Sequence, residues 1–391
     1  MRSTRAAITG AGLITPLGDD LARLMESLRE GQSALTQQGA GSLMVPNFEA
    51  SRYANVRGMR AYNRTTQLGI CAATLALSDA RLGSDQVPSE QFGLVMASTH
   101  GHVDTLVEYD FGLVTKGMER TNPALMPLAI GSAPGSASAL AFRMRGCSVT
   151  LSVGAAGGLE ALGFAARMVE SGRLRACLVV GAFAPLAGHS LGCDANLSDH
   201  HGARVFDAES RGMVLAEAAC ALVVEPLTAA RERAANVHGV VLGHAAGFHP
   251  SPETLGMSLA DSAQRALTRA ELSPADVALI SSGANGLPSD DEAHAHALCA
   301  MFYASSPKPP ALIAPKANLG ESMDAAGLLQ VLVGLSALRS GVAPAIAGLS
   351  TPRVPGPRYT QRSARIERGA LLTTASSRTG STSALVLAAD A

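Results

Sequence analysis

Short apolar runs alternate with longer segments of helical periodicity along almost the whole chain. Such alternation is typical of layered α/β folds, in which strands and helices pack on one another. The longer segments are rich in alanine and leucine and poor in charge, so we expect those helices to be buried on more than one side. The strongest strand candidates are 6–9, 93–97, 149–153, 177–181, 219–224, 239–243, 277–281, 370–374 and 383–387, and the strongest helix candidates are 63–80, 159–171, 258–270 and 325–340.

Two of the predicted helices repeat one another. Segment 158–172 begins with Gly-Leu and ends with Ser-Gly, and segment 327–341 has the same length and the same two ends. A repeat of this kind indicates a duplicated half. We place the break between the halves in the charged stretch 228–236, which divides the chain into residues 1–232 and 233–391.

Composition narrows the class of protein. Of the 391 residues 47% are hydrophobic and 16% charged, and the formal net charge is −1 with no basic stripe, so nucleic acid is not an expected partner. No apolar run approaches the roughly 20 residues of a membrane span. The cysteines form no CxxC pair, which favours reduced thiols in a cytoplasmic protein. They are Cys71, Cys147, Cys177, Cys193, Cys220 and Cys299.

General motifs give no catalytic, cofactor or metal site. The Gly10-Ala11-Gly12 pair follows a predicted strand but lacks the third glycine of a dinucleotide loop, so we interpret it as a turn. The pairs His100/His102 and His294/His296 have no third ligand at a recognised spacing, and we expect ordinary surface histidines. There is no P-loop.

The turn before the helix at 159–171 resembles the nucleophile segment of the β-ketoacyl synthases. It reads Ser-Val-Gly-Ala-Ala-Gly-Gly over 152–158. Three other blocks resemble that family in the same order: 7–18 its opening strand, 206–217 its central Asp/Gly/Glu block, and 315–327 its lysine–glycine–histidine segment. The resemblance implies a duplicated thiolase-type five-layer αβαβα fold that forms tight dimers.

The resemblance also identifies the positions that carry the family's chemistry. An active member has a cysteine at the turn, because a thiolate accepts the acyl chain, and two histidines that stabilise the enolate formed on decarboxylation. Here these positions are Ala155, Gly283 and Glu321. Ser152 is the nearest hydroxyl to the turn but lies on the preceding strand. We therefore predict no catalytic residue.

One lysine of the family site is retained. Lys316 orients the site in active relatives and pairs with a glutamate, whose position here is His294. Our hypothesis is that Glu321 now neutralises Lys316 in an internal ion pair; the alternative is a solvated lysine. The family's glycine-rich phenylalanine gate is replaced by Ser-Ser-Arg-Thr-Gly-Ser over 376–381.

A ketosynthase fold without its chemistry resembles the chain-length factors of type II polyketide systems. Such a factor forms a heterodimer with an active ketosynthase, receives chains carried by an acyl carrier protein, and limits the depth of the tunnel for the growing chain. Most carry glutamine where this chain has Ala155, and the factors of aryl-polyene and polyene pathways are a closer match. Alignment places the tunnel-facing helix at 104–113, with Leu106 at the pocket floor and Thr105, Tyr109 and Phe111 beside it.

These four residues have a simpler interpretation, as core or dimer-interface side chains. Two other functions are also compatible with the sequence. One is a stand-alone hydrolase or decarboxylase of acyl thioesters that uses Glu321 or a histidine. The other is a homodimeric binding protein for acyl chains or carrier protein.

Overall fold

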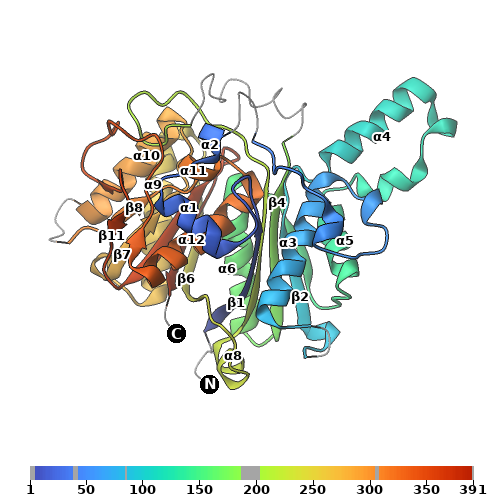
Figure 1. The fold of residues 1–391 in the computed structure, drawn as a ribbon, viewed down its shortest axis with the longest axis horizontal. Coiled ribbons are helices and arrows are strands. Elements are labelled where there is room, and N and C mark those ends of the chain that lie inside the picture. Colours follow the sequence, from blue (N-terminus) through green and yellow to red (C-terminus); the bar gives the residue numbers. More distant parts are fainter. Residues whose placement is uncertain (1–4, 38–42, 84–85, 186–202, 304–307, 390–391) are drawn as a thin grey trace.

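The computed structural model describes residues 5–37, 43–83, 86–185, 203–303 and 308–389. Eleven strands form one mixed sheet in the order β10-β8-β7-β12-β13-β6-β1-β5-β4-β2-β3 (Figure 1). The first half contributes β1 (Ala6–Ile14), β2 (Phe92–Ala97), β3 (Ser148–Leu151), β4 (Ala176–Phe183) and β5 (Ala218–Pro226). The second half contributes β6 (Gly239–Phe248), β7 (Val277–Ser281), β8 (Ala311–Ile313), β10 (Arg358–Tyr359), β12 (Ala370–Ser376) and β13 (Ser381–Ala388).

The two halves repeat the same strand topology. β5 pairs antiparallel with β1 and β4, and β2 pairs parallel with β4 and β3. In the same way β13 pairs antiparallel with β6 and β12, and β7 pairs parallel with β12 and β8. The halves join through an antiparallel contact between β1 and β6. The duplication that the sequence predicts is therefore present, while the boundary between residues 232 and 233, at the end of α8 (Leu227–Glu232), stays a prediction.

Helices complete five layers. α3 (Arg64–Ala80) covers one outer face on β1 and β5, and α9 (Leu255–Ala270) covers the other on β6 and β13. α6 (Gly157–Glu170) and α12 (Ala326–Ser340) form the middle layer and pack on each other. The remaining helices include α1 (Leu21–Arg29), α2 (Ala34–Gln37), α10 (Pro288–Leu298) and α11 (Lys316–Leu319), and β9 (Val342–Ala343) pairs with β11 (Ala364–Arg365).

The repeated Gly-Leu signals mark the crossing of the two middle helices. A Cβ on Gly158 would lie 3.0 Å from the backbone nitrogen of Leu328, and a Cβ on Gly327 would lie 2.9 Å from that of Leu159. Only glycine allows the two backbones to approach so closely. The repeated Gly-Leu pairs therefore lie at the contact between the two halves.

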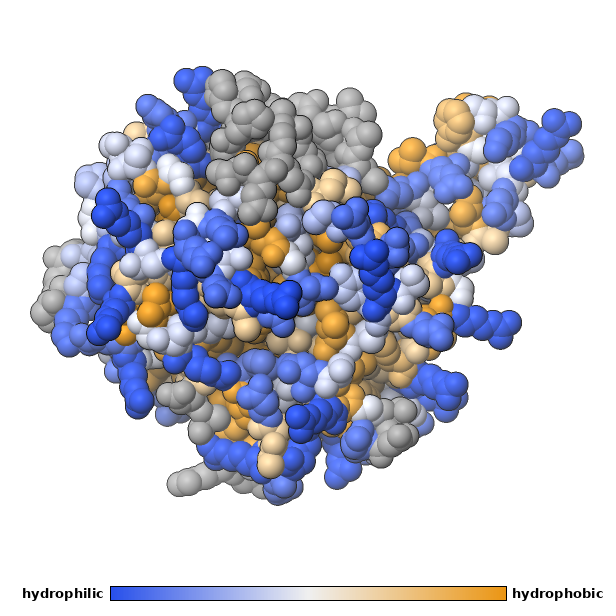
Figure 2. All heavy atoms as spheres, viewed as in Figure 1, coloured by the Kyte–Doolittle hydropathy of each residue, from blue (hydrophilic) through white to orange (hydrophobic). Residues whose placement is uncertain are grey.

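One segment projects from the body, and we call residues 103–130 the arm. It contains α4 (Val103–Lys116), η4 (Met118–Arg120) and η5 (Pro123–Leu128), and α5 (Ala133–Ala141) returns the chain to the sheet at β2 and β3 (Figure 1). Apolar surface is visible along the arm in Figure 2. Its large exposed apolar side chains are Val107, Phe111, Val114, Met118, Met126 and Ile130.

Several sequence predictions need correction. The Gly10–Gly12 pair lies inside β1 rather than in a turn after it, because β1 runs to Ile14. His294 is buried and not at the surface.

The cysteines are free thiols where the structure describes them. Cys71, Cys177 and Cys220 are buried, Cys147 and Cys299 are partly exposed, and Cys193 lies outside the described residues. Within the described ranges, no helix has the length and apolar character needed to cross a bilayer.

Candidate functional site

The candidate site lies where the turns that follow β3, β7 and β8 meet in the middle of the molecule. The Lys316 ammonium donates to the Gly283 carbonyl at 3.0 Å, so the turn after β7 touches the segment after β8. The turn after β3 joins them through Thr99, whose hydroxyl accepts from the Gly154 amide at 2.8 Å and donates to the Asp324 carboxylate at 2.8 Å. The positions that the sequence predicts are therefore brought together.

The segment predicted to correspond to the family's nucleophile turn forms a tight turn into a helix. Gly154 has φ of 64°, a conformation that glycine adopts freely, and the 3-10 turn Gly154–Ala156 leads directly into α6. Ala155 is buried and presents only a methyl group. Ser152 follows the last residue of β3 and is exposed, so its hydroxyl does not take the place of a thiol at the buried Ala155.

The first histidine position has no room for a side chain. A Cβ on Gly283 would lie 2.8 Å from the Thr374 carbonyl oxygen and 2.9 Å from the Ala375 Cα, both in β12. Because these are backbone atoms of a central strand, they cannot move aside as a flexible side chain would. An imidazole is therefore sterically excluded at this position.

The second histidine position is occupied by a buried carboxylate. Glu321 Oε2 lies 2.7 Å from Lys316 Nζ, and both side chains are at most 3% exposed. The same carboxylate accepts from Asn285 Nδ2 at 3.2 Å and from the Met323 amide at 2.8 Å. The predicted ion pair is confirmed, and the alternative of a solvated lysine is wrong.

His294 is held neutral beside this pair. Its Nδ1 lies 3.1 Å from Ser282 Oγ and its Nε2 lies 2.9 Å from Ser376 Oγ. Burial, with a further contribution from the Lys316 charge, lowers the pKa of His294 to about 3. Hydroxyl groups donate or accept as required, so a neutral imidazole satisfies both contacts.

Asp324 is a component of the site that sequence reasoning missed. Its side chain is fully buried, and burial raises its pKa to about 7, with the nearby Glu321 charge adding to the effect. One oxygen accepts from the Thr99 amide and the other from the Thr99 hydroxyl, each at 2.8 Å. The available signal was an aspartate immediately before the apolar run of α12, where a charge is costly unless it is hydrogen-bonded.

The replaced gate loop closes on itself beside a small cavity. The Ser377 amide donates to the Ser381 carbonyl at 2.8 Å, and His249 Nε2 lies 3.2 Å from the Ser377 carbonyl oxygen. A cavity of about 200 Å³ lies against this loop, with Asp290 and Arg378 among its lining residues. Among the described residues, no three histidine, cysteine or carboxylate side chains are grouped so that they could hold a metal ion.

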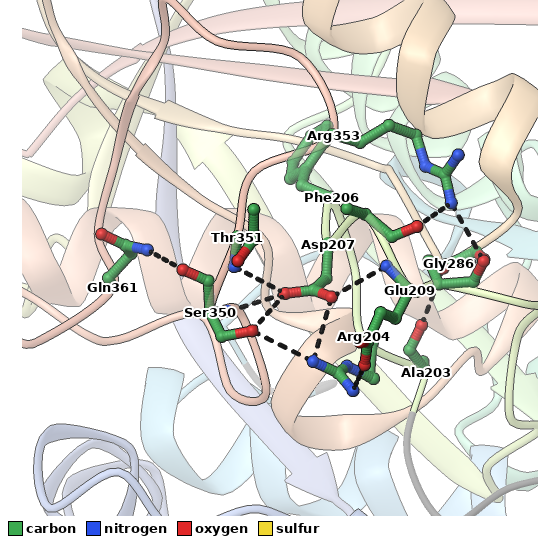
Figure 3. Close-up of polar contacts among 12 residues, drawn as sticks. Ala203, Arg204, Phe206, Asp207, Glu209, Gly286, Ser350, Thr351, Arg353 and Gln361 are labelled. Atoms are coloured by element: carbon green, nitrogen blue, oxygen red, sulfur yellow. Dashed lines mark hydrogen bonds and ion pairs between the residues drawn. The ribbon is translucent and has the colours of Figure 1, made fainter.

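A network of polar contacts around Asp207 holds the central Asp/Gly/Glu block (Figure 3). The Asp207 carboxylate accepts from the amides of Ser350 and Thr351 at 2.7 and 2.9 Å, and Arg204 pairs with it at 3.0 Å. Glu217, at the end of the block, pairs with Arg64 at the start of α3. Glu321 is fixed by backbone bonds to Val214 and Ala216 of the same block.

The four tunnel candidates lie on α4. Thr105 is buried and accepts from Asn63 Nδ2 at 3.3 Å. Leu106 and Tyr109 are partly exposed, and Phe111 is 66% exposed. Within this chain they form one stretch of the arm, and their role at a tunnel stays a prediction.

Comparison with known proteins identifies the family. The model of the beta-ketoacyl synthase N-terminal domain matches residues 3–230, and the C-terminal domain model matches residues 234–350. A putative polyketide beta-ketoacyl synthase 2 of Streptomyces halstedii is 30% identical, covering 87% of this chain and 86% of its own. The tetracenomycin polyketide synthase ketoacyl synthase beta subunit of Streptomyces glaucescens is 29% identical, covering 88% of each.

Solved structures match the whole chain. The ishigamide ketosynthase/chain length factor superposes with a TM-score of 0.88 at 24% identity and covers 100% of both chains. A beta-ketoacyl synthase from Burkholderia phymatum gives a TM-score of 0.86 at 20% identity, covering 99% of this chain and 100% of its own. These likenesses confirm the predicted thiolase-type fold. On the family models and the relatives together, the chain belongs to the β-ketoacyl synthase family.

Proposed function

We propose that this chain is a non-catalytic ketosynthase-like subunit that forms a heterodimer with an active β-ketoacyl synthase and shapes the tunnel for the growing acyl chain. The observation that carries the proposal is the buried Lys316–Glu321 pair, 2.7 Å apart, at the centre of the family's site. A decarboxylating site must stabilise a developing negative charge, and a carboxylate at this position repels it.

Two further observations support a loss of catalysis that does not depend on one substitution alone. Ala155 supplies no nucleophilic atom, and the backbone of β12 excludes a side chain at Gly283. Nucleophilic attack and enolate stabilisation are therefore lost at separate positions. Restoring one of them would not restore turnover, because the steps act as a unit.

The exposed arm supplies the second part of the proposal. It carries a continuous series of large apolar side chains, of which Val114 is 86% and Met118 is 83% exposed. Apolar surface of this kind marks protein interaction sites. Thr105 and Leu106 lie near the start of α4 at Val103, so the root of the arm is where this chain would limit the tunnel of a partner. A structure of a type II polyketide acyl-carrier protein in complex with its ketosynthase resembles this chain with a TM-score of 0.85, which supports a carrier protein as the source of the chain.

The test is co-expression with an active β-ketoacyl synthase from the same organism. We expect a stable heterodimer that elongates carrier-bound chains, while the isolated chain turns over neither acyl nor malonyl thioesters. Turnover by the isolated protein would instead establish a stand-alone hydrolase or decarboxylase. Binding of acyl chains or carrier protein by a homodimer, with no ketosynthase partner, would establish the binding-protein alternative.

A further inference from the structure

Asp324 makes a two-point contact with a single residue. It lies in the 3-10 turn Met323–Ala325 that precedes α12, and both of its carboxylate oxygens accept from Thr99, one from the amide and one from the hydroxyl, at 2.8 Å each. Two bonds to one residue fix that residue's orientation as well as its distance. Neither bond contributes to the Lys316–Glu321 pair.

Thr99 stands at the root of the arm. β2 ends at Ala97 and α4 begins at Val103, so Thr99 belongs to the short connection between them. Its hydroxyl also accepts from the Gly154 amide at 2.8 Å. The connection that leads into the arm is thus bonded directly to the emptied catalytic centre.

A second residue holds the same connection from the opposite side. Asn63 caps α3, and its Nδ2 donates to the Gly101 carbonyl at 2.7 Å and to Thr105 Oγ1 at 3.3 Å. Beyond Thr105, α4 packs on η4 and η5, which are themselves part of the arm. The direction in which α4 leaves the body is therefore set by contacts at its root.

We propose that Asp324 is a positioning residue for the arm: it fixes Thr99, and through Thr99 the orientation of α4. The effect on the isolated chain needs no partner, whereas its consequence for product length rests on the proposed function. On this proposal the centre that has lost its catalytic residues keeps a structural role. The Asp324 side chain inside it holds α4, the helix that would meet the partner.

Three variants and one control test this inference. Asp324→Ala removes both acceptors. Asp324→Asn keeps an acceptor for the Thr99 amide and can donate to the Thr99 hydroxyl, so it should preserve the contact. Thr99→Val removes only the hydroxyl and serves if Asp324→Ala does not fold. The control, Asp291→Ala, removes an equally buried carboxylate whose hydrogen bonds come from the Phe206, Asn285 and Gly286 amides, outside the arm root.

The first measurement is amide hydrogen exchange of the isolated protein over residues 99–116. Variants are compared at denaturant concentrations that give them the same free energy of unfolding, so that global stability is matched. We expect exchange there to rise about tenfold in Asp324→Ala, less in Thr99→Val, and little in Asp324→Asn or Asp291→Ala. The proposal would be overturned if exchange over residues 99–116 were the same in Asp324→Ala and Asp291→Ala, whether raised in both or unchanged in both.

The second measurement is the product of the reconstituted heterodimer. We expect Asp324→Ala to broaden the distribution of chain lengths and Asp291→Ala to leave it unchanged. If exchange of the arm rises but the products stay the same, the positioning role holds and the proposed role of the arm in chain length is wrong. If products broaden without any change in exchange, Asp324 acts by another route and this inference is wrong.

Discussion

In the interior the Lys316 side chain donates to Glu321 and to the Gly283 carbonyl, which replace the water it has lost. The energetics of such a pair are asymmetric. Attraction between the charges roughly offsets their desolvation, so the intact pair adds little stability, but removing one member leaves an uncompensated buried charge. The intact pair therefore adds little to the free energy of unfolding. Its main effect is to fill the centre of the candidate site with two paired charges.

This asymmetry gives the first prediction. Glu321→Gln should lower the free energy of unfolding by about 3–5 kcal/mol, and Lys316→Met combined with Glu321→Gln should recover most of that loss. Denaturant unfolding measures both. As a control, Asp261→Asn removes the exposed partner of Arg265, 2.8 Å away, and should cost at most about 1 kcal/mol. If Glu321→Gln lowered the free energy of unfolding by no more than Asp261→Asn does, Lys316 would be hydrated in the variant and the prediction would be wrong.

His294 gives a pH prediction with a definite sign. Its pKa in the folded protein is about 3, below its ordinary 6.5, so the unfolded chain binds a proton in the window between these values while the folded chain does not. Its contribution to stability is therefore lost as pH falls from 6.5 toward 3. His294→Gln should reduce the stability difference between pH 7 and pH 5 by on the order of 1 kcal/mol.

The control for this pH effect lies on the same helix. His296 is exposed, and His296→Gln should leave the pH dependence of unfolding unchanged. Asp291 and Asp324, whose pKa values burial raises to about 7, act in the opposite direction between about pH 4 and 7. Their contribution is common to all three proteins and cancels in the comparison. Equal pH slopes for the two glutamine variants would contradict the prediction.

The steric exclusion at Gly283 is testable with the smallest side chain. Gly283→Ala should lower the free energy of unfolding by about 2 kcal/mol or more, because a methyl group there meets β12 backbone. Gly69→Ala in α3 is the matched control, since its Cβ would meet side chains only at 3.4 Å and beyond. Thermal unfolding of both proteins decides the point: similar melting temperatures would mean that β12 yields.

At the scale of elements, the pattern of apolar runs predicted the main strands and the four long helices, because each buries a continuous apolar face. It underestimated β1 and β6, whose glycines and alanines look weak in isolation but pack between two layers. It missed β8, which has only three residues, Ala311–Ile313. Local patterns carry too little information for such short strands.

The same limit separates what was foreseen at the site from what was not. Motif order located Ala155, Gly283, Lys316 and Glu321, because these positions sit at fixed distances from recognisable blocks. The burial of His294 and the contact between Asp324 and Thr99 depend on tertiary packing, and Asp324 lies 225 residues from Thr99 along the chain. No local pattern reports a contact of that range.

For α4, the prediction concerns product length. Leu106→Ala or Phe111→Ala should lengthen the product of the reconstituted pair, because a smaller side chain leaves more room at the end of the tunnel. Met257→Ala is the control, since Met257 is as exposed as Phe111 but lies on α9. Mass spectrometry of released products gives the distribution. Unchanged length in both arm variants would remove these residues from the tunnel.

At the scale of the whole molecule, two exposed features, the edge strand β3 and the arm, lie at the same end of the fold. β3 is the last strand of the sheet and is only partly covered, and α5, which returns the chain from the arm, packs on β2 and β3. An open sheet edge and exposed apolar side chains are both liabilities in a monomer. A partner that covers this end would remove both at once, which favours a lasting heterodimer over a transient encounter.

The final prediction tests that end of the molecule directly. Val114→Glu places a charge at an 86% exposed position of the arm, so it should leave the fold of the isolated chain intact while placing a desolvated carboxylate in any interface formed there. We expect affinity for the partner ketosynthase to fall at least about tenfold, measured by size-exclusion chromatography and titration calorimetry. Met257→Glu, at a 69% exposed position on α9, should pair normally. If both variants pair like the wild type, the heterodimer uses another face, and the exposed apolar series of the arm needs a different occupant.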